Sequence, residues 1–167
     1  MSIRESDIDM RILSCIISVG LALMAAGPAA FGQQPLPAAF DGMFRGKLVD
    51  GSGEVGAEFT VTIRKSNAGF TVSWPPRIAA RFEPAGRSGV FRTRDKSQIL
   101  EGDPVYWARL EDGALVVYKA QIGEHGGYQI YNFIYTPSGD GLDLVIRHVM
   151  AGAEPQISSG KLNRYGG

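Results

Sequence analysis

The chain has 167 residues, 44% of them hydrophobic, and a formal net charge of zero at pH 7. A neutral chain without runs of like charge lacks the basic surface that nucleic-acid binding needs, so we expect no nucleic-acid partner. The single cysteine, Cys15, has no second cysteine with which to form a disulfide or a thiolate metal site. Because the chain has only two histidines in addition, we expect no metal and no other cofactor.

The first 32 residues have the pattern of a signal peptide. Arg11 precedes an apolar or small stretch over residues 12–26, which is shorter than the about 20 residues of a transmembrane helix and typical of a leader. Ala30 and Gly32 place small residues where a cleavage site needs them. Acidic residues before Met10 are unusual in a leader, so we expect translation to start at Met10. The sequence therefore predicts cleavage after Gly32, a periplasmic or secreted protein, and a mature chain without an integral membrane span.

Residues 33–42 contain two prolines and no periodicity, which predicts an extended arm. From residue 43 onward, apolar and polar residues alternate with the period of a half-buried strand. In the stretch 55–64, for example, Phe59 and Val61 fall on an apolar face that alternates with charged and hydroxyl side chains. The same period continues, interrupted by glycine, asparagine and aspartate turns, over residues 70–74, 78–83, 90–94, 105–111, 114–122, 128–135, 142–150 and 156–164.

The order of these elements predicts an all-β fold. Almost every connection is short enough for a hairpin between neighbours, and consecutive hairpins make an antiparallel up-and-down meander. Closure into a barrel pairs the two edge strands that a long meander would leave open. We therefore expect a single lipocalin-like barrel of about eight to ten strands over residues 43–164, followed by a short tail at 165–167. A sandwich of two sheets is the alternative.

The stretch 128–135 is apolar on both faces, unlike a strand with one wet side. One face carries Tyr128, Ile130, Asn132 and Ile134, and the other carries Gln129, Tyr131, Phe133 and Tyr135. If the first face points inward, the aromatic residues of the second lie outside, near Trp107. If the second face points inward, these aromatic residues line the barrel and Asn132 lies outside. In the two preceding strands, alternation predicts Tyr106 inside, Trp107 outside and Tyr118 inside.

The opening Phe-Asp-Gly-Met-Phe-Arg-Gly at residues 40–46, the meander and the closing Gly-Lys-Leu-Asn-Arg at residues 160–164 together resemble the calycin barrels. This group contains lipocalins, fatty-acid-binding proteins and nitrobindin-like proteins, and the resemblance implies a barrel with an interior. The lipocalin Gly-x-Trp motif is absent, because Phe44 stands where the tryptophan would be. The histidine that would hold haem in a nitrobindin-like barrel is absent from the final strand. The stretch 106–118 also resembles short exported bacterial proteins.

We expect the barrel to bind a small apolar or amphipathic molecule. The inward-facing candidates for contact with it are Phe59, Val61, Phe70, Trp74, Phe82, Tyr118 and Ile130, with Asn132 or His148 as a polar anchor. The alternative is a protein-interaction, inhibitor or envelope module, monomeric or homodimeric, with an outer patch of Trp107, Tyr131, Phe133 and Tyr135. An eight-stranded barrel can also be filled by its own side chains.

Catalytic residues are not expected. The sequence has no strained serine motif, and its carboxylates fall mainly in predicted turns, where they are ordinary. His125 lies in a glycine-rich turn, whereas His148 shares the apolar face of Leu144 and should point toward the core. Residues 77–96 contain the one local excess of positive charge, which we interpret as the solvated side of two edge strands or as a patch for an anionic partner.

Overall fold

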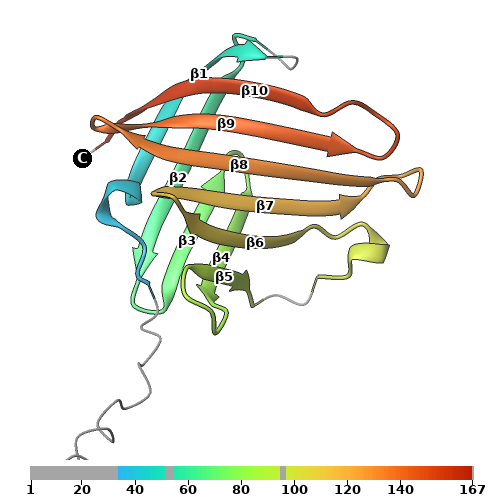
Figure 1. Cartoon of the computed structure of the whole chain (residues 1–167), viewed down its shortest axis with the longest axis horizontal. Helices are drawn as coiled ribbons and strands as arrows, with labels where there is room; N and C mark the ends of the chain where they lie inside the picture. The colour runs from blue at the N-terminus through green and yellow to red at the C-terminus, as the bar shows by residue number, and fades with distance from the viewer. Residues whose placement is uncertain (1–33, 52–54, 95–96, 167) are drawn as a thin grey trace, which may run out of the picture. The chain divides into compact units, whose positions relative to one another are not determined.

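The computed structural model describes residues 34–51, 55–94 and 97–166. These residues form a closed barrel of antiparallel strands, in which each strand pairs with its neighbours in the chain and β1 pairs with β10 (Figure 1). The prediction of an all-β meander closing into a barrel is therefore confirmed, and the two-sheet sandwich is wrong. The architecture is compatible with a calycin-like barrel. The predicted signal peptide lies outside the described residues.

Ten strands and two short 3-10 turns account for the regular structure of the described chain. The strands are β1 (Gly42–Gly51), β2 (Glu58–Ser66), β3 (Gly69–Trp74), β4 (Ile78–Pro84), β5 (Val90–Thr93), β6 (Val105–Glu111), β7 (Ala114–Ile122), β8 (Tyr128–Ser138), β9 (Gly141–Met150) and β10 (Gln156–Arg164). The 3-10 turns are η1 (Ala38–Phe40) and η2 (Ile99–Glu101). Each strand expected from the alternation is present, with small shifts at its ends.

Tight turns set the register between the strands that carry the candidate site. Asp112 and Gly113 both have positive φ angles, 50° and 79°, as required by the hairpin turn that best matches the twist of two strands. Trp107 is consequently paired with Tyr118, and the turn at residues 139–140 fixes β8 against β9 in the same way. Paired residues lie on the same face of a sheet, so these turns decide which side chains enter the barrel.

One end of the barrel is closed by the protein's own side chains. Leu36 and Phe40, from the segment before β1, belong to the hydrophobic core and are almost fully buried. Arg164 in β10 donates hydrogen bonds to the carbonyl oxygens of Ala39 and Asp41, and so ties the last strand to this segment. The described part of the predicted arm therefore contains the η1 turn and plugs this end of the barrel.

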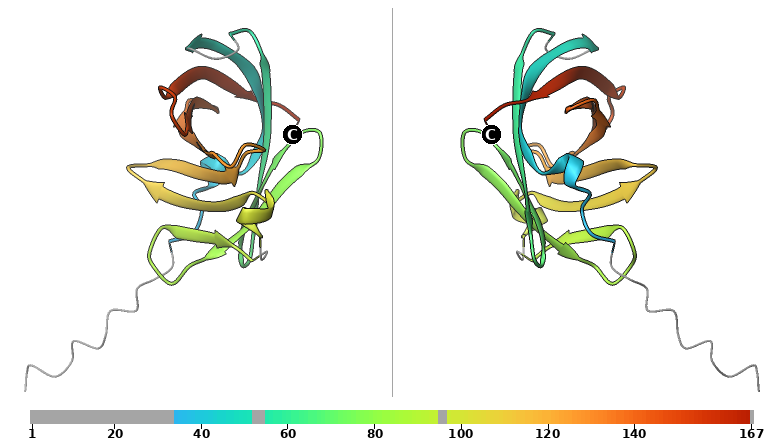
Figure 2. Two further views of the ribbon diagram at one scale, coloured as in Figure 1. Left: turned by 90° about the vertical axis from the view of Figure 1, so that its right-hand side faces the viewer. Right: turned by 90° about the vertical axis from the view of Figure 1, so that its left-hand side faces the viewer.

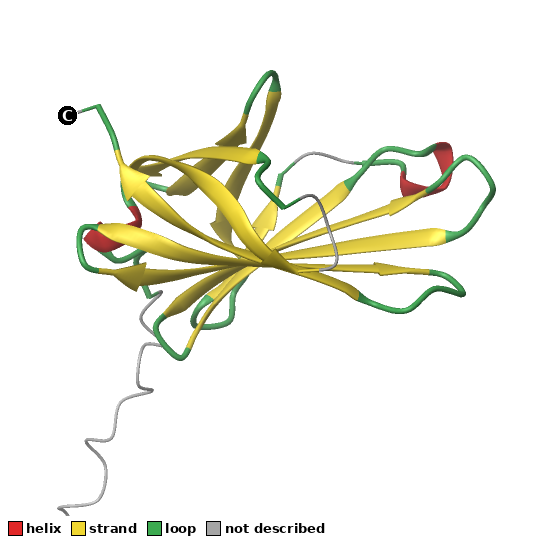
Figure 3. Ribbon diagram, turned by 90° about the horizontal axis from the view of Figure 1, so that it is seen from above, coloured by secondary structure: helices red, strands yellow, loops and turns green. Residues whose placement is uncertain are grey.

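The opposite end carries the β7–β8 and β9–β10 loops. Figure 3 shows η1 and η2 on opposite sides of the barrel, and Figure 2 looks along β6 to β10 from either end. No helix within residues 34–51, 55–94 and 97–166 has the length and apolar character needed to cross a membrane.

Candidate functional site

The inner face of β6 to β10 presents its side chains in rows, because paired residues on neighbouring strands stand side by side. The row nearest the β7–β8 and β9–β10 loops, here called the mouth row, consists of Tyr106, Lys119, Tyr131, His148 and Gln156. The middle row consists of Ala108, Val117, Phe133, Ile146 and Ser158. The floor row consists of Leu110, Leu115, Tyr135, Leu144 and Gly160.

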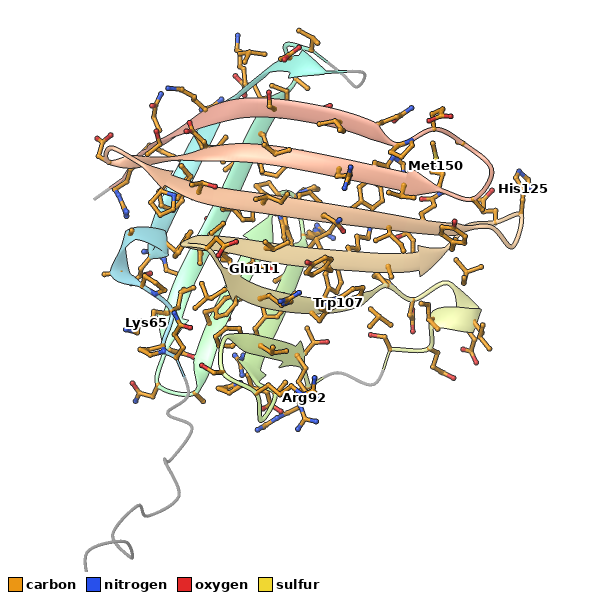
Figure 4. All side chains as sticks on the ribbon, in the orientation of Figure 1. Lys65, Arg92, Trp107, Glu111, His125 and Met150 are labelled. Carbon is orange, nitrogen blue, oxygen red and sulfur yellow. The ribbon has the colours of Figure 1, made fainter. Side chains whose placement is uncertain are left out.

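Burial decreases from the floor row to the mouth row. Tyr135 and Leu144 in the floor row are at most 1% exposed, whereas the mouth row is half-buried except for Gln156, which is exposed. Because the side chains of the mouth row point inward, this exposure means that water reaches the inner face of the barrel at this end. Two grooves, of about 660 and 180 Å³, lie beyond the mouth row toward the loops, and both are lined by Gln129 of β8 and by Glu124 and His125 of the β7–β8 loop. In Figure 4, Met150 marks this end.

Aromatic rings form a connected cluster beneath and within the mouth row. We call it the inner aromatic cluster, and its members are Phe59, Trp74, Tyr106, Tyr131 and Phe133. The ring centroid of Trp74 lies 5.9 Å from that of Tyr106 and 5.5 Å from that of Phe133. Phe133 in turn lies 6.2 Å from Phe59 and 6.1 Å from Tyr131. These rings give the open end of the barrel an apolar inner wall.

The indole nitrogen of Trp74 has its partner inside the protein. Trp74 Nε1 donates a buried hydrogen bond of 3.0 Å to Oη of Tyr135 in the floor row. Burial raises the pKa of Tyr135 well above its ordinary value, although the hydrogen bond from Trp74 opposes that effect. The hydroxyl of Tyr135 therefore stays protonated, and Trp74 can present its ring to the mouth without leaving a buried donor unsatisfied.

The mouth row brings a lysine and a histidine to one tyrosine ring. Lys119 Nζ lies 5.3 Å from the centroid of the Tyr131 ring, within the range of a cation–π interaction. The imidazole of His148 stacks on the same ring, with 3.9 Å between centroids. The ion pairs among the described residues are Arg45–Glu58, Arg92–Glu83, Arg94–Glu83 and Arg109–Glu111. Within the described chain, Lys119 thus has no carboxylate partner.

Burial disfavours the charged forms of both groups. It lowers the pKa of the Lys119 ammonium. For His148, burial lowers the pKa, a hydrogen bond with Gln156 raises it, and the positive charge of Lys119 lowers it. Nε2 of His148 is buried, and none of the described residues offers it a hydrogen-bond partner. Lys119 is therefore the cation of the mouth row, and His148 adds positive charge only when it is protonated at lower pH.

The structure separates the sequence-predicted ligand contacts into three groups. Phe59, Trp74 and His148 lie on the inner face near the open end. Three further residues are fully buried within the core and reach no open surface: Val61, Phe70 and Phe82. The remaining three lie on the outer face of the barrel, because they alternate with residues of the inner rows: Tyr118, Ile130 and Asn132. The expectation that Tyr118 points inward is wrong, because it pairs with the outward-facing Trp107.

The open question about residues 128–135 has a definite answer. Tyr131, Phe133 and Tyr135 face inward, opposite His148, Ile146 and Leu144 respectively. Of the four residues predicted as an outer patch, Trp107 alone lies outside, where its ring stacks on Tyr118 with 4.8 Å between centroids.

Tyr106 and Lys119 supply an aromatic ring and a positive charge to the mouth row, and Lys119 was not among the residues predicted from the sequence. The expectation that Tyr118 points inward places its neighbour Lys119 on the outer face. The signal that could have found it is the Asp112–Gly113 turn. A two-residue turn pairs the residues that flank it, and counting outward from there places Lys119 opposite the inward-facing Tyr106.

Another groove, of about 780 Å³, lies at the plugged end near Lys65 (Figure 4). Its lining consists mostly of the segment 34–36 and the β2–β3 turn, with Glu83, Pro84 and Phe91. Its charged residues are Lys65, which is exposed, and Glu83, which pairs with Arg92 and Arg94. The mouth, where a half-buried cation lies against an aromatic ring, is the stronger candidate. Across the three described ranges, no three histidine, cysteine, aspartate or glutamate side chains gather in a way that could hold a metal ion.

Fold and site together define a closed ten-stranded antiparallel β-barrel with an inner face that is apolar inside and polar at its open end. Comparisons of the chain with protein-family models, with curated proteins and with solved structures found no match.

Proposed function

We propose that the protein is an exported binding protein that holds a small amphipathic molecule at the open end of its barrel. The observation that carries this proposal is the change in character along the inner face. Polar and cationic side chains in the mouth row lie above the aromatic rings of Trp74 and Phe133. Binding sites of small molecules combine a mostly apolar wall with a few polar groups that fix orientation. The leader-like sequence at residues 1–32 supports export.

The proposed site is shallow. Tyr135, Leu115 and Leu144 already fill the floor row, so a ligand would contact the mouth row and the half-buried part of the middle row, such as Phe133. Its polar end would stay at the mouth, because the buried interior offers few hydrogen-bond partners to a polar group.

Native mass spectrometry tests this proposal on protein exported by its host and purified without detergent. We expect an additional mass that disappears on denaturation. In the variant Tyr131→Ala, which removes a ring from the inner face, occupancy should fall. In the matched variant Tyr118→Ala, which removes a ring from the outer face, occupancy should be unchanged. A bare protein that also fails to bind neutral N-phenyl-1-naphthylamine in a fluorescence titration would refute the proposal.

The Trp107–Tyr118 stack on the outer face favours a second function, in which the barrel docks on another protein. Both rings are only half-buried, and exposed aromatic rings often mark interaction sites. Under this alternative, Trp107→Ala would change oligomeric state or partner capture and leave the extra mass of the native protein in place.

A further inference from the structure

We propose that the ligand is an amphipathic anion, whose single negatively charged group pairs with Lys119 at the mouth of the barrel. This inference rests on the function proposed above and specifies the chemical class of the molecule bound. A carboxylate and a sulfonate share the relevant chemistry, since each presents oxygen atoms and one negative charge to an ammonium group.

The position of Lys119 is the first argument. Lysine side chains at protein surfaces usually project their ammonium into water, whereas Lys119 lies on the inner face with Nζ against the Tyr131 ring. Partial burial of a charge has a free-energy cost unless the charge is paired. The cation–π contact offsets only a part of that cost at a partly exposed site. An anion that enters the mouth and pairs with Lys119 would offset a larger part of this free-energy cost.

The surroundings of Lys119 are the second argument. Its neighbours in the mouth row are Tyr106 on β6 and Tyr131 on β8, which are neutral. The next residue along the row is His148, which can add positive charge but no negative charge. Gln121, one position further out on the inner face, is hydrogen-bonded to Gln129 at 3.1 Å. The mouth row itself therefore carries positive and no negative charge, with an aromatic wall directly beneath it. Glu101 and Glu124 line the groove beyond Gln121. Neither of these carboxylates forms an ion pair with Lys119.

The other described lysines and arginines are exposed, and several of them also lack a carboxylate at ion-pair distance, so partial burial distinguishes Lys119 from them. Arg45, Arg94 and Arg109 each pair with a carboxylate and are exposed on the outer face. Arg164 donates to backbone carbonyl groups at the plugged end. Among the cations of the described chain, Lys119 combines an inward position, partial burial and the lack of a carboxylate partner. This combination points to an external anion.

Two dyes with the same aromatic frame test the inference. One is 8-anilinonaphthalene-1-sulfonate, which is an anion, and the other is N-phenyl-1-naphthylamine, which lacks the sulfonate and is neutral. Both are titrated into the purified exported protein, and dissociation constants are measured by fluorescence. We expect Lys119→Met to weaken binding of the anionic dye by about tenfold, the scale of one charge-assisted hydrogen bond. Binding of the neutral dye should change by less than about twofold, because the aromatic wall is intact.

Two further variants serve as controls. Lys119→Arg keeps the positive charge and should retain most of the affinity for the anionic dye. Lys161→Met removes an exposed lysine from β10 and should have no effect on either dye. Equal losses for the two dyes in Lys119→Met, or no loss for the anionic dye, would overturn the anion assignment while the proposed function stands. If the wild-type protein binds neither dye, the anion assignment fails, and the proposed function fails with it when native mass spectrometry also finds a bare protein.

Discussion

At the scale of single residues, the surroundings of His148 make the stability of the protein depend on pH. The groups that face it are Tyr131 on β8, Lys119 across that ring on β7, and neutral Gln156 on β10. Burial and the charge of Lys119 keep its pKa below the ordinary 6.5. The unfolded chain therefore takes up this proton at a higher pH than the folded protein does. The contribution of His148 to stability is complete above about pH 6.5 and falls as the pH drops through its folded pKa.

Binding of an anion should raise the pKa of His148, whereas burial and the charge of Lys119 lower it. A negative group near Lys119 favours the imidazolium, so we expect the anionic dye to bind more tightly as the pH falls from about 7.5 to about 5.5. NMR titration of the imidazole protons should show a higher pKa of His148 in the complex. The variant His148→Gln should lose this pH dependence, whereas His125→Gln, in an exposed turn, should keep it. Affinity that is independent of pH in the wild-type protein would contradict the coupling.

Removal of the hydroxyl oxygen of Tyr135 tests how much the Trp74–Tyr135 hydrogen bond contributes to stability. Tyr135→Phe keeps the ring and removes the acceptor, which leaves Trp74 Nε1 buried without its partner. We expect the free energy of unfolding to fall by about 1–3 kcal/mol, measured by urea denaturation. Tyr128→Phe is the matched control, because Tyr128 is 49% exposed, and its effect should stay within about 0.5 kcal/mol. Equal effects of the two substitutions would contradict the assigned role of this bond.

At the scale of elements, close contact between strands depends on glycine in β1. A Cβ atom on Gly46 would overlap the carbonyl oxygen of Lys161 in the paired strand β10. Gly46→Ala should therefore lower the free energy of unfolding by about 1–3 kcal/mol, as overpacking does. Gly127→Ala is the control, since a Cβ atom there would meet the Ala151 side chain at an ordinary 3.4 Å. An unchanged denaturation midpoint for Gly46→Ala would show that β1 and β10 can move apart without a loss in the free energy of unfolding.

A comparison of the strands with the sequence-based expectations shows which features of the fold could be predicted. Alternation with period two, together with the turn residues between the runs, predicted the strands, because most strands have one face in the core and one face toward water. It failed for the facing of β7, where Val116, Val117 and Tyr118 are all apolar or aromatic and the period carries no information. The candidate site was harder to predict from the sequence than the strands were, because the mouth row takes one residue from each of five strands. Only the register between strands brings Lys119 and His148 to the same ring.

At the scale of the whole molecule, the barrel has one plugged end and one open end. We therefore expect substitutions at the plugged end to change the free energy of unfolding and those at the open end to change ligand binding. Phe40 is fully buried at the plugged end, whereas the mouth row is half-buried at the other. Phe40→Ala leaves a cavity in the core, so we expect the free energy of unfolding to fall by about 3–5 kcal/mol. The dissociation constant of the anionic dye should change by less than about twofold under conditions where the variant remains folded.

The control for this prediction is Leu100→Ala, because Leu100 is 88% exposed on η2. Its unfolding free energy should change by no more than about 0.5 kcal/mol. Urea denaturation and dye titration on the same samples give both quantities for each variant. If Phe40→Ala weakens dye binding while circular dichroism shows a native spectrum, then the plug supports the geometry of the mouth and the two ends are coupled through the core. If binding is unchanged, the floor row isolates the binding site from changes at the plugged end.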